Sequence, residues 1–283
     1  MMRKFSNILI FGLSLTLFFT SCKKKEKEED TETVSASESS LANSIDNDMN
    51  NIGDEAGRTK NISSYKTSEN NSIMSSCATL KFDTLVNTNA DSITINFGNV
   101  NCVCLDGRLR KGSLLIIYNG KYKDSLTTIT VTPINYYVNN NKVDGGKTIK
   151  NLGHNAAGHL VYEINATISI LKADNSGTIQ WSGLRYREWL AGESTLIWSD
   201  DKYSLTGNAS GSNANGRSYS SVITSGKPLI RDMSLPCRKH FISGELRHTP
   251  EGKPARIIDF GDGTCDDKAT VTINSKTYTI TLP

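Results

Sequence analysis

The chain has 283 residues, of which 37% are hydrophobic, and its 32 Lys and Arg against 29 Asp and Glu give a formal net charge of +3. This nearly even balance excludes a dedicated nucleic-acid binder, which usually carries a strongly basic face, so we expect no nucleic-acid partner. The hydrophobic fraction lies below the ~45–50% that is usual for globular domains, and part of the chain is therefore expected to stay outside any packed core.

Residues 1–21 have the pattern of an export signal. Arg3 and Lys4 precede an apolar run over 8–19, which is shorter than the ~20 residues that a membrane-spanning helix needs. Two small residues directly before Cys22 resemble a bacterial lipobox, at which the chain is cut before a cysteine that then receives acyl chains. An ordinary signal peptide, or an uncleaved anchor, is the alternative. The lipobox implies that Cys22 attaches the mature chain to a membrane of the cell envelope, and we expect the outer membrane.

Residues 22–75 are expected to form a polar tether. They are rich in Ser, Asn, Asp, Glu and Thr and lack the apolar density that a core requires, which predicts disorder over most of the stretch. A short helix over 40–56 is the expected interruption, because four apolar residues recur there at helical spacing. These residues are Leu41, Ile45, Met49 and Ile52. The helix is expected to dock on the folded domain, or else to form only transiently in a spacer.

Residues 76–283 are expected to form one all-β domain, an antiparallel β-sandwich or barrel of about 10–14 strands. Segments such as 92–97 and 159–172 alternate apolar and polar residues, and no long helical pattern is visible after residue 60. Turn dipeptides and tripeptides separate the apolar segments. They are Asn139-Asn140, Gly145-Gly146, Asn175-Ser176-Gly177, Asn215-Gly216 and Asn274-Ser275.

Two segments of this domain resemble each other. Residues 95–102 read INFGNVNC and residues 258–265 read IDFGDGTC, and each is followed by the pattern of a β-hairpin. The simplest interpretation is two similar halves around a central set of strands. Chance similarity of two strand–turn units is the alternative.

The cysteines of the domain are expected to form disulfides, because an exported chain folds in an oxidising compartment. The internal similarity suggests the pairs Cys77–Cys102 and Cys237–Cys265, which leaves Cys104 over. A Cys77–Cys104 pair with Cys102 free is the close alternative. A metal site at the two neighbouring cysteines is disfavoured, because no second cysteine pair of the kind found in structural zinc sites follows.

No cofactor and no resident metal is expected, although one acidic loop is a weak Ca²⁺ candidate. Four carboxylates fall within nine residues around two glycines, and oxygen-rich loops can hold Ca²⁺. They are Asp259, Asp262, Asp266 and Asp267. The alternative is a turn stabilised by side-chain-to-backbone hydrogen bonds, which needs no metal.

A candidate binding face combines the aromatic and basic residues of one segment. Arginine beside aromatic rings can hold sugars or anions by stacking and forked hydrogen bonds. The residues are Trp181, Arg185, Arg187 and Trp189. The alternatives are arginine–carboxylate pairs across strands and tryptophans that pack in a core. Neither the HExxH nor the GxSxG motif occurs, so no catalytic residue is assigned and an enzyme is not the expected class.

Three Asp-Ser/Thr-apolar triplets resemble the sequon for periplasmic O-glycosylation in Bacteroidota. They would place glycans on Thr84, Ser92 and Ser125. A glycan needs a solvent-facing hydroxyl, so this prediction requires all three side chains to face solvent.

Several motifs in order resemble a set of uncharacterised Bacteroidota lipoproteins. The chain carries DGRLRKG at 106–112, WSGLRYREW at 181–189, NGRSYS at 215–220 and FGDGTCDDKATVTINSKTY at 260–278. The resemblance covers about residues 75–283 and implies an envelope location and a β-architecture. It carries over no catalytic or binding residue.

The expected function is that of a membrane-anchored envelope module that binds a glycan, a polymer or a protein without catalysis. One alternative is a carrier that holds a lipid or other apolar ligand inside a β-barrel, which requires an apolar interior of more than ~300 Å³. The other is an envelope hydrolase, which requires a clustered Ser–His–Asp set or a carboxylate pair in a cleft.

Overall fold

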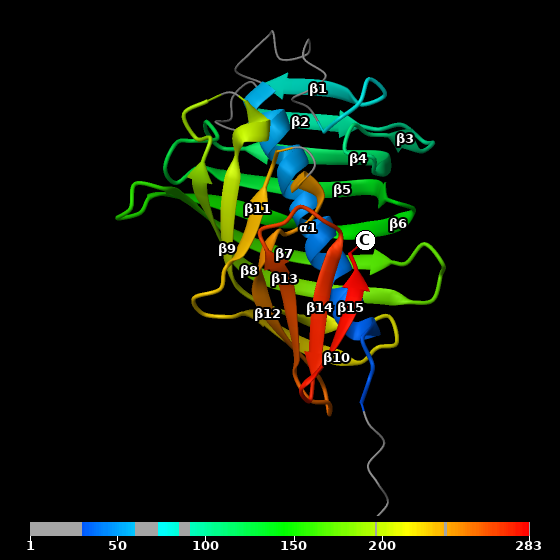
Figure 1. Ribbon diagram of the computed structural model, residues 1–283. Coiled ribbons are helices and arrows are strands. Elements are labelled where there is room, and N and C mark those ends of the chain that lie inside the picture. The colour runs from blue at the N-terminus through cyan, green and yellow to red at the C-terminus, as the bar shows by residue number, and fades with distance from the viewer. Residues whose placement is uncertain (1–29, 60–72, 85–90, 196, 235–236, 283) are drawn as a thin grey trace, which may run out of the picture.

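The computed structural model describes one antiparallel β-sheet that wraps around a single long helix (Figure 1). The prediction of an all-β sandwich or barrel-like fold is confirmed. The structure describes residues 30–59, 73–84, 91–195, 197–234 and 237–282, without the side chains of residues 57–59, 84 and 198. In this part of the chain, no helix is both long and apolar enough to cross a membrane.

The helix, the strands and the short 3-10 helices follow one another in this order along the chain. They are α1 (Val34–Thr59), β1 (Thr79–Thr84), β2 (Asp91–Asn96), β3 (Cys102–Val103), β4 (Leu109–Tyr118), β5 (Thr128–Val138), β6 (Asn141–His154), β7 (Leu160–Leu171), β8 (Thr178–Ala191), η3 (Trp198–Asp200), β9 (Lys202–Ser212), β10 (Ser218–Ile223), β11 (Leu229–Asp232), η4 (Cys237–Lys239), β12 (Ser243–Pro250), β13 (Arg256–Asp262), β14 (Lys268–Ile273) and β15 (Lys276–Thr281).

The sheet is a meander in which strands that are neighbours in sequence pair with each other. Its order is β1-β2-β4-β5-β6-β7-β8-β9-β10-β12-β13-β14-β15, while β3 pairs with β4, and β11 pairs with β9 and β12. The sheet has 15 strands, slightly more than expected, because β3 has 2 residues and β11 has 4, too few to show alternation in the sequence.

The two-residue turns form where asparagine occupies left-handed backbone. Asn139 and Asn140 have φ angles of 48° and 65° between β5 and β6, and Asn274 has a φ of 48° between β14 and β15. Gly145-Gly146 was predicted as a turn, and this is wrong, because both residues lie within β6. A Cβ at Gly145 would lie 2.2 Å from a backbone oxygen of β7, so glycine is needed there for close strand approach.

The helix predicted over 40–56 is present, longer than expected, as α1. The apolar residues Ile45, Met49 and Ile52 are buried. The polar residues between them are buried as well, and the helix contacts β2, β5, β7, β8 and β12. The prediction that most of this stretch is disordered is wrong for 34–59, because its polar side chains find partners on the sheet. The folded unit therefore includes α1 as a central core element.

The short chain before α1 already contacts the sheet. Asp30 Oδ2 lies 2.9 Å from Arg256 Nη2 on β13, and Glu32 accepts a hydrogen bond of 2.7 Å from the backbone N–H of Ser35 near the start of the helix. Seven residues, 23–29, separate Cys22 from Asp30 in the sequence, which allows at most about 28 Å between the two when the chain is extended. This is much shorter than the tether expected from composition.

The disulfides join Cys77 to Cys102 and Cys237 to Cys265, as the internal similarity predicted, and Cys104 is free and buried. The two similar segments also share a buried phenylalanine followed by a glycine with positive φ. These residues are Phe97 and Gly98 in one segment, and Phe260 and Gly261 in the other.

Candidate functional site

The interior of the sheet is occupied by α1 and is charged. Each acidic residue on the middle of the helix meets a cation or a phenol from a strand. Asp48 contacts Arg108 Nη1 at 2.7 Å and Arg110 Nη2 at 2.5 Å. Asp46 pairs with Lys147 of β6, and Asp54 lies 2.5 Å from Arg187 Nη1 of β8. A buried charge is tolerated only when it is paired and hydrogen-bonded, so these contacts fix α1 in the sheet.

The pairing has electrostatic consequences for both partners. Burial by itself would raise the pKa of Asp48, but Arg110 and Arg108 hold this pKa below its usual value. Burial lowers the pKa of Lys147 in spite of the Asp46 carboxylate. Tyr122 donates to Asp54 and accepts a 2.6 Å hydrogen bond from Arg187, and burial raises the pKa of its phenol.

The candidate binding face at 181–189 does not lie on an accessible surface. Trp181 and Trp189 are each 1% exposed, and Arg185 and Arg187 are each 2% exposed. The arginines bind inside the sheet: Arg185, for example, donates to Asn43 Oδ1 of α1 at 3.0 Å. The prediction that these four residues form an exposed binding face is therefore wrong, because alternate residues of β8 point to the helix.

A serine–histidine chain lies near the start of α1. His248 Nε2 lies 2.7 Å from Ser35 Oγ, and His248 Nδ1 lies 2.9 Å from Ser221 Oγ. Burial, with a contribution from Arg256, lowers the pKa of His248 to about 4. Both ring nitrogens of His248 thus contact hydroxyls, and the residue is fully buried. While α1 occupies the sheet, this serine–histidine chain therefore holds the helix in place and is closed to a substrate.

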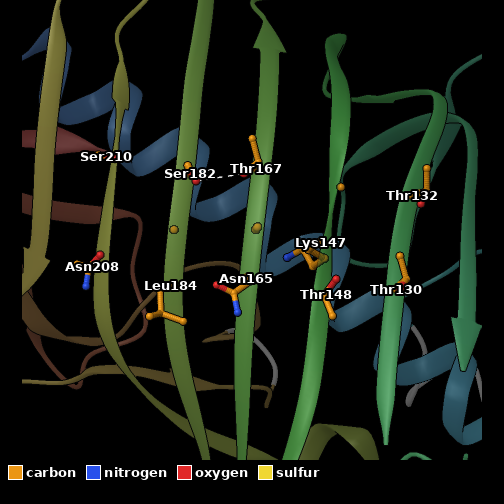
Figure 2. A pocket seen from close by; sticks show the side chains of 13 residues that line it. Thr130, Thr132, Lys147, Thr148, Asn165, Thr167, Ser182, Leu184, Asn208 and Ser210 are labelled. Carbon is orange, nitrogen blue, oxygen red and sulfur yellow. Dashed lines mark hydrogen bonds between the residues drawn. The ribbon is translucent and has the colours of Figure 1, made fainter. Parts of the chain in front are cut away.

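The outward-facing residues of β5–β9 form a polar surface, which we call the outer-face groove (Figure 2). The groove has a volume of about 490 Å³. Its side chains stand in two rows across five strands. One row is Thr130, Thr148, Asn165, Leu184 and Asn208, and the other is Thr132, Gly146, Thr167, Ser182 and Ser210.

The rows follow from strand register and alternation. Residues paired across neighbouring strands lie about 4.8 Å apart, and outward residues along one strand lie about 7 Å apart. Thr167 Oγ1 and Ser182 Oγ are 3.1 Å apart and hydrogen-bonded, as the dashed line in Figure 2 shows. Gly146 has no side chain, so it opens a gap in its row. The groove therefore offers a regular grid of short donors and acceptors.

An aromatic ring borders this grid. Tyr186 is two residues beyond Leu184 on the same face of β8 and is 36% exposed. Its cross-strand partners are Glu163 and Thr206. The outer face thus combines hydroxyl and amide groups with one accessible ring, and the Glu163 carboxylate beside the ring accepts a 3.2 Å hydrogen bond from Asn165 Nδ2.

The acidic loop at 259–267 makes local turns. Asp259 Oδ1 accepts from the N–H of Gly261 at 2.9 Å, Asp262 Oδ1 accepts from the N–H of Thr264 at 3.2 Å, and Asp266 and Asp267 contact Lys268. In the described part of the chain, no three His, Cys, Asp or Glu residues gather in a way that could hold a metal ion. The four carboxylates of the Ca²⁺ candidate are thus not brought together.

The remaining predicted sites stay predictions. Ser125 is exposed and Ser92 is half-buried on β2, while the side chain of Thr84 and the whole of Cys22 lie outside the described residues.

Sequence reasoning missed the outer-face groove, although its signal was present. Thr130 and Thr132 of β5, and Asn165 and Thr167 of β7, alternate with buried apolar residues.

Comparison of this chain with protein-family models, with curated proteins and with solved structures finds no match.

Proposed function

We propose that the protein is a non-catalytic envelope module, lipid-anchored through Cys22, that binds a neutral glycan in the outer-face groove. The observation that carries the proposal is the pair of short polar rows across β5–β9, bordered by Tyr186. A sugar presents hydroxyls around its ring edge and C–H groups on its faces. Hydroxyl and amide side chains can hydrogen-bond the sugar hydroxyls, and an aromatic ring can pack against the C–H faces.

The absence of charge in the two rows favours a neutral ligand. Their members with polar side chains are Thr, Ser and Asn, and the one cation that lines the groove, Lys147, is turned inward to Asp46. The volume of about 490 Å³ lies within the usual range for ligand sites, about 300–1,000 Å³. The groove is open along the sheet, which suits part of a longer polymer.

The interior favours this proposal over the two alternatives. A carrier of apolar ligands needs an empty apolar interior, but α1 and its ion pairs fill the space between the strands. A hydrolase needs an accessible nucleophile, whereas Ser35 on α1 and Ser221 on β10 are both buried around His248.

If Cys22 carries the lipid anchor that we propose, the short spacer keeps the module close to its membrane. With seven residues between Cys22 and Asp30, the end of the sheet near Arg256 would face the lipid surface. The outer-face groove lies on the flank of the sheet, so a polymer could reach it from the side.

The test is the affinity of purified full-length protein in detergent for neutral cello-, malto-, manno- and xylo-oligosaccharides, measured by calorimetry. Tyr186→Ala and Asn165→Ala are expected to weaken the Kd of a bound oligosaccharide about tenfold each, which matches the loss of one ring contact or of one or two buried hydrogen bonds. Thr272→Ala, outward on β14 and far along the sheet, is the matched control and is expected to leave the Kd unchanged.

Two results would contradict the proposal. One is that none of these oligosaccharides binds. The other is that one binds with the same Kd in all three variants, which would place its site away from the groove.

A further inference from the structure

A second pocket, which we call the basic pocket, lies where three distant parts of the chain meet. Its volume is about 620 Å³. One wall is the turn between β3 and β4 around Gly107, another is η4 with the residues that follow it, and the third is the loop at 265–267. The disulfide Cys237–Cys265 joins two of these walls, so the pocket is held in a fixed shape.

Cations outnumber their partners in this region. Arg108 and Arg110 share the carboxylates of Asp48 and Asp106. In the described part of the chain, Arg231 and Lys239 have no carboxylate within ion-pair distance. Arg231 donates to the backbone oxygen of Arg238 and lies 5.6 Å from the ring centre of Phe241.

Arg231 carries a buried donor without a hydrogen-bond partner. Arg231 is only 2% exposed, so water from the surface does not reach its Nε, and this atom has no hydrogen-bond partner among the residues that the structure describes. Arg231 lines a small cavity of about 10 Å³, room for one water molecule, together with Lys239 and His240. Lys239 and His240 also line the basic pocket, so the buried charge lies directly behind its wall.

The neighbouring groups respond to this surplus of positive charge. Burial, and then the charges of Arg108, Arg231 and Lys239, lower the pKa of His240 to about 4. Burial and the charge of Arg108 lower the pKa of Arg231 to about 9. An anion in the basic pocket would offset the repulsion that adds to the effect of burial on both pKa values.

The carboxylates that line the pocket do not cancel this charge. Both oxygens of Asp106 are bound by Arg110, at 2.8 Å and 2.6 Å. Asp266 and Asp267 also line the pocket and are solvent-exposed, so water and salt screen them. Asp267 lies 2.9 Å from Lys268, and its charge also acts on His240.

We propose that the basic pocket binds a phosphate group, either of a phosphorylated sugar or of inorganic phosphate. Lys239 is the direct ligand, with its amino group placed over Gly107, and Arg231 supplies charge from behind the wall. A phosphate with nearly two negative charges matches these two cations, and Gly107 has no side chain that would cover the Lys239 amino group. This site is independent of the outer-face groove and carries a charged ligand instead of a neutral one.

The test uses full-length protein in detergent with glucose 6-phosphate, inorganic phosphate and glucose as probes. Both phosphates are expected to bind and glucose is not. Lys239→Ala is expected to weaken the Kd about tenfold, as the loss of one charge-assisted hydrogen bond predicts, and Lys239→Arg should restore most of it. Lys121→Ala removes an exposed cation elsewhere and is expected to change nothing.

The His240 ring provides a readout at the site itself. Its pKa, followed by NMR, is expected to rise when phosphate is added to the parent protein and to stay constant in Lys239→Ala. Tighter binding of glucose 6-phosphate than of phosphate would identify a phosphomonoester as the ligand class, and equal binding would identify the free anion. No binding of either phosphate, or a Kd and a His240 pKa that respond equally in parent and Lys239→Ala, would overturn the proposal.

Discussion

Asp48 Oδ1 on α1 lies 2.5 Å from Arg110 Nη2 on β4, and neither side chain is more than 1% exposed. The contact is one of a series of ion pairs along the helix. Removing one partner of a buried pair is costly mainly because it leaves the other charge buried without a counter-charge. The helix is thus held by charge as well as by Ile45, Met49 and Ile52.

Asp48→Asn is expected to lower the free energy of unfolding by about 3–5 kcal/mol, because it leaves two buried guanidinium groups with one carboxylate. Urea denaturation followed by tryptophan fluorescence measures this. Asp144→Asn removes the exposed partner of Lys142 and is expected to cost far less, because solvent screens this pair. Equal costs for the two variants would argue against the buried network.

The pair Asp46–Lys147 is expected to behave as a unit. Asp46→Leu or Lys147→Met alone leaves one uncompensated buried charge and is expected to cost several kcal/mol. The double variant replaces both charges by apolar groups and should be more stable than either single variant. A double-mutant cycle in urea gives the coupling energy, and additive costs would mean that the two groups do not interact.

His248 predicts a loss of stability in mild acid. Its pKa is about 4 in the folded protein and ~6.5 in an unfolded chain, so the unfolded state binds more protons between these values. The stability that neutral His248 contributes is fully present above about pH 6.5. As the pH falls toward 4, the free energy of unfolding decreases by about 3 kcal/mol. His248→Gln is expected to flatten this part of the stability–pH curve. The exposed His154→Gln should leave it unchanged, and an unchanged curve in His248→Gln would contradict the account.

Cys104 is expected to be the one thiol of the folded unit. It is buried, and burial raises its pKa, so a thiol reagent at neutral pH should not label it before unfolding. Denaturation without a reductant should expose one thiol between residues 30 and 283. Non-reducing peptide mapping should recover Cys77 with Cys102, and recovery of Cys77 with Cys104 would show the alternative pairing.

The strands and turns were predictable because their signals are local. Alternation over 159–172 reports a strand with one buried face, and Asn-rich turns report positive φ angles. The disulfide pairs were predictable from the similarity of two segments, a comparison within the chain.

The place of α1 was not predictable, because it depends on charges far away in sequence. A stretch of Ser, Asn and Asp is usually solvated, but here Lys147 and Arg187 on the sheet pair with the helix carboxylates. Long-range contacts with the helix also explain why Arg187 points inward to Asp54 and Arg185 to Asn43. The alternation of residues along β8 shows that the strand has two faces. Which face is accessible depends on the position of α1, which covers one of them.

Hydrogen exchange of α1 tests the central claim, that the helix is a permanent part of the core, most directly. The buried amides of residues 42–56 are expected to exchange as slowly as those of β7 and β8, through global unfolding only. Asp48→Asn should speed exchange in the helix and in these strands together. Fast exchange over 42–56 beside protected strands would contradict the account, because it would show a helix that leaves the sheet while the sheet stays folded.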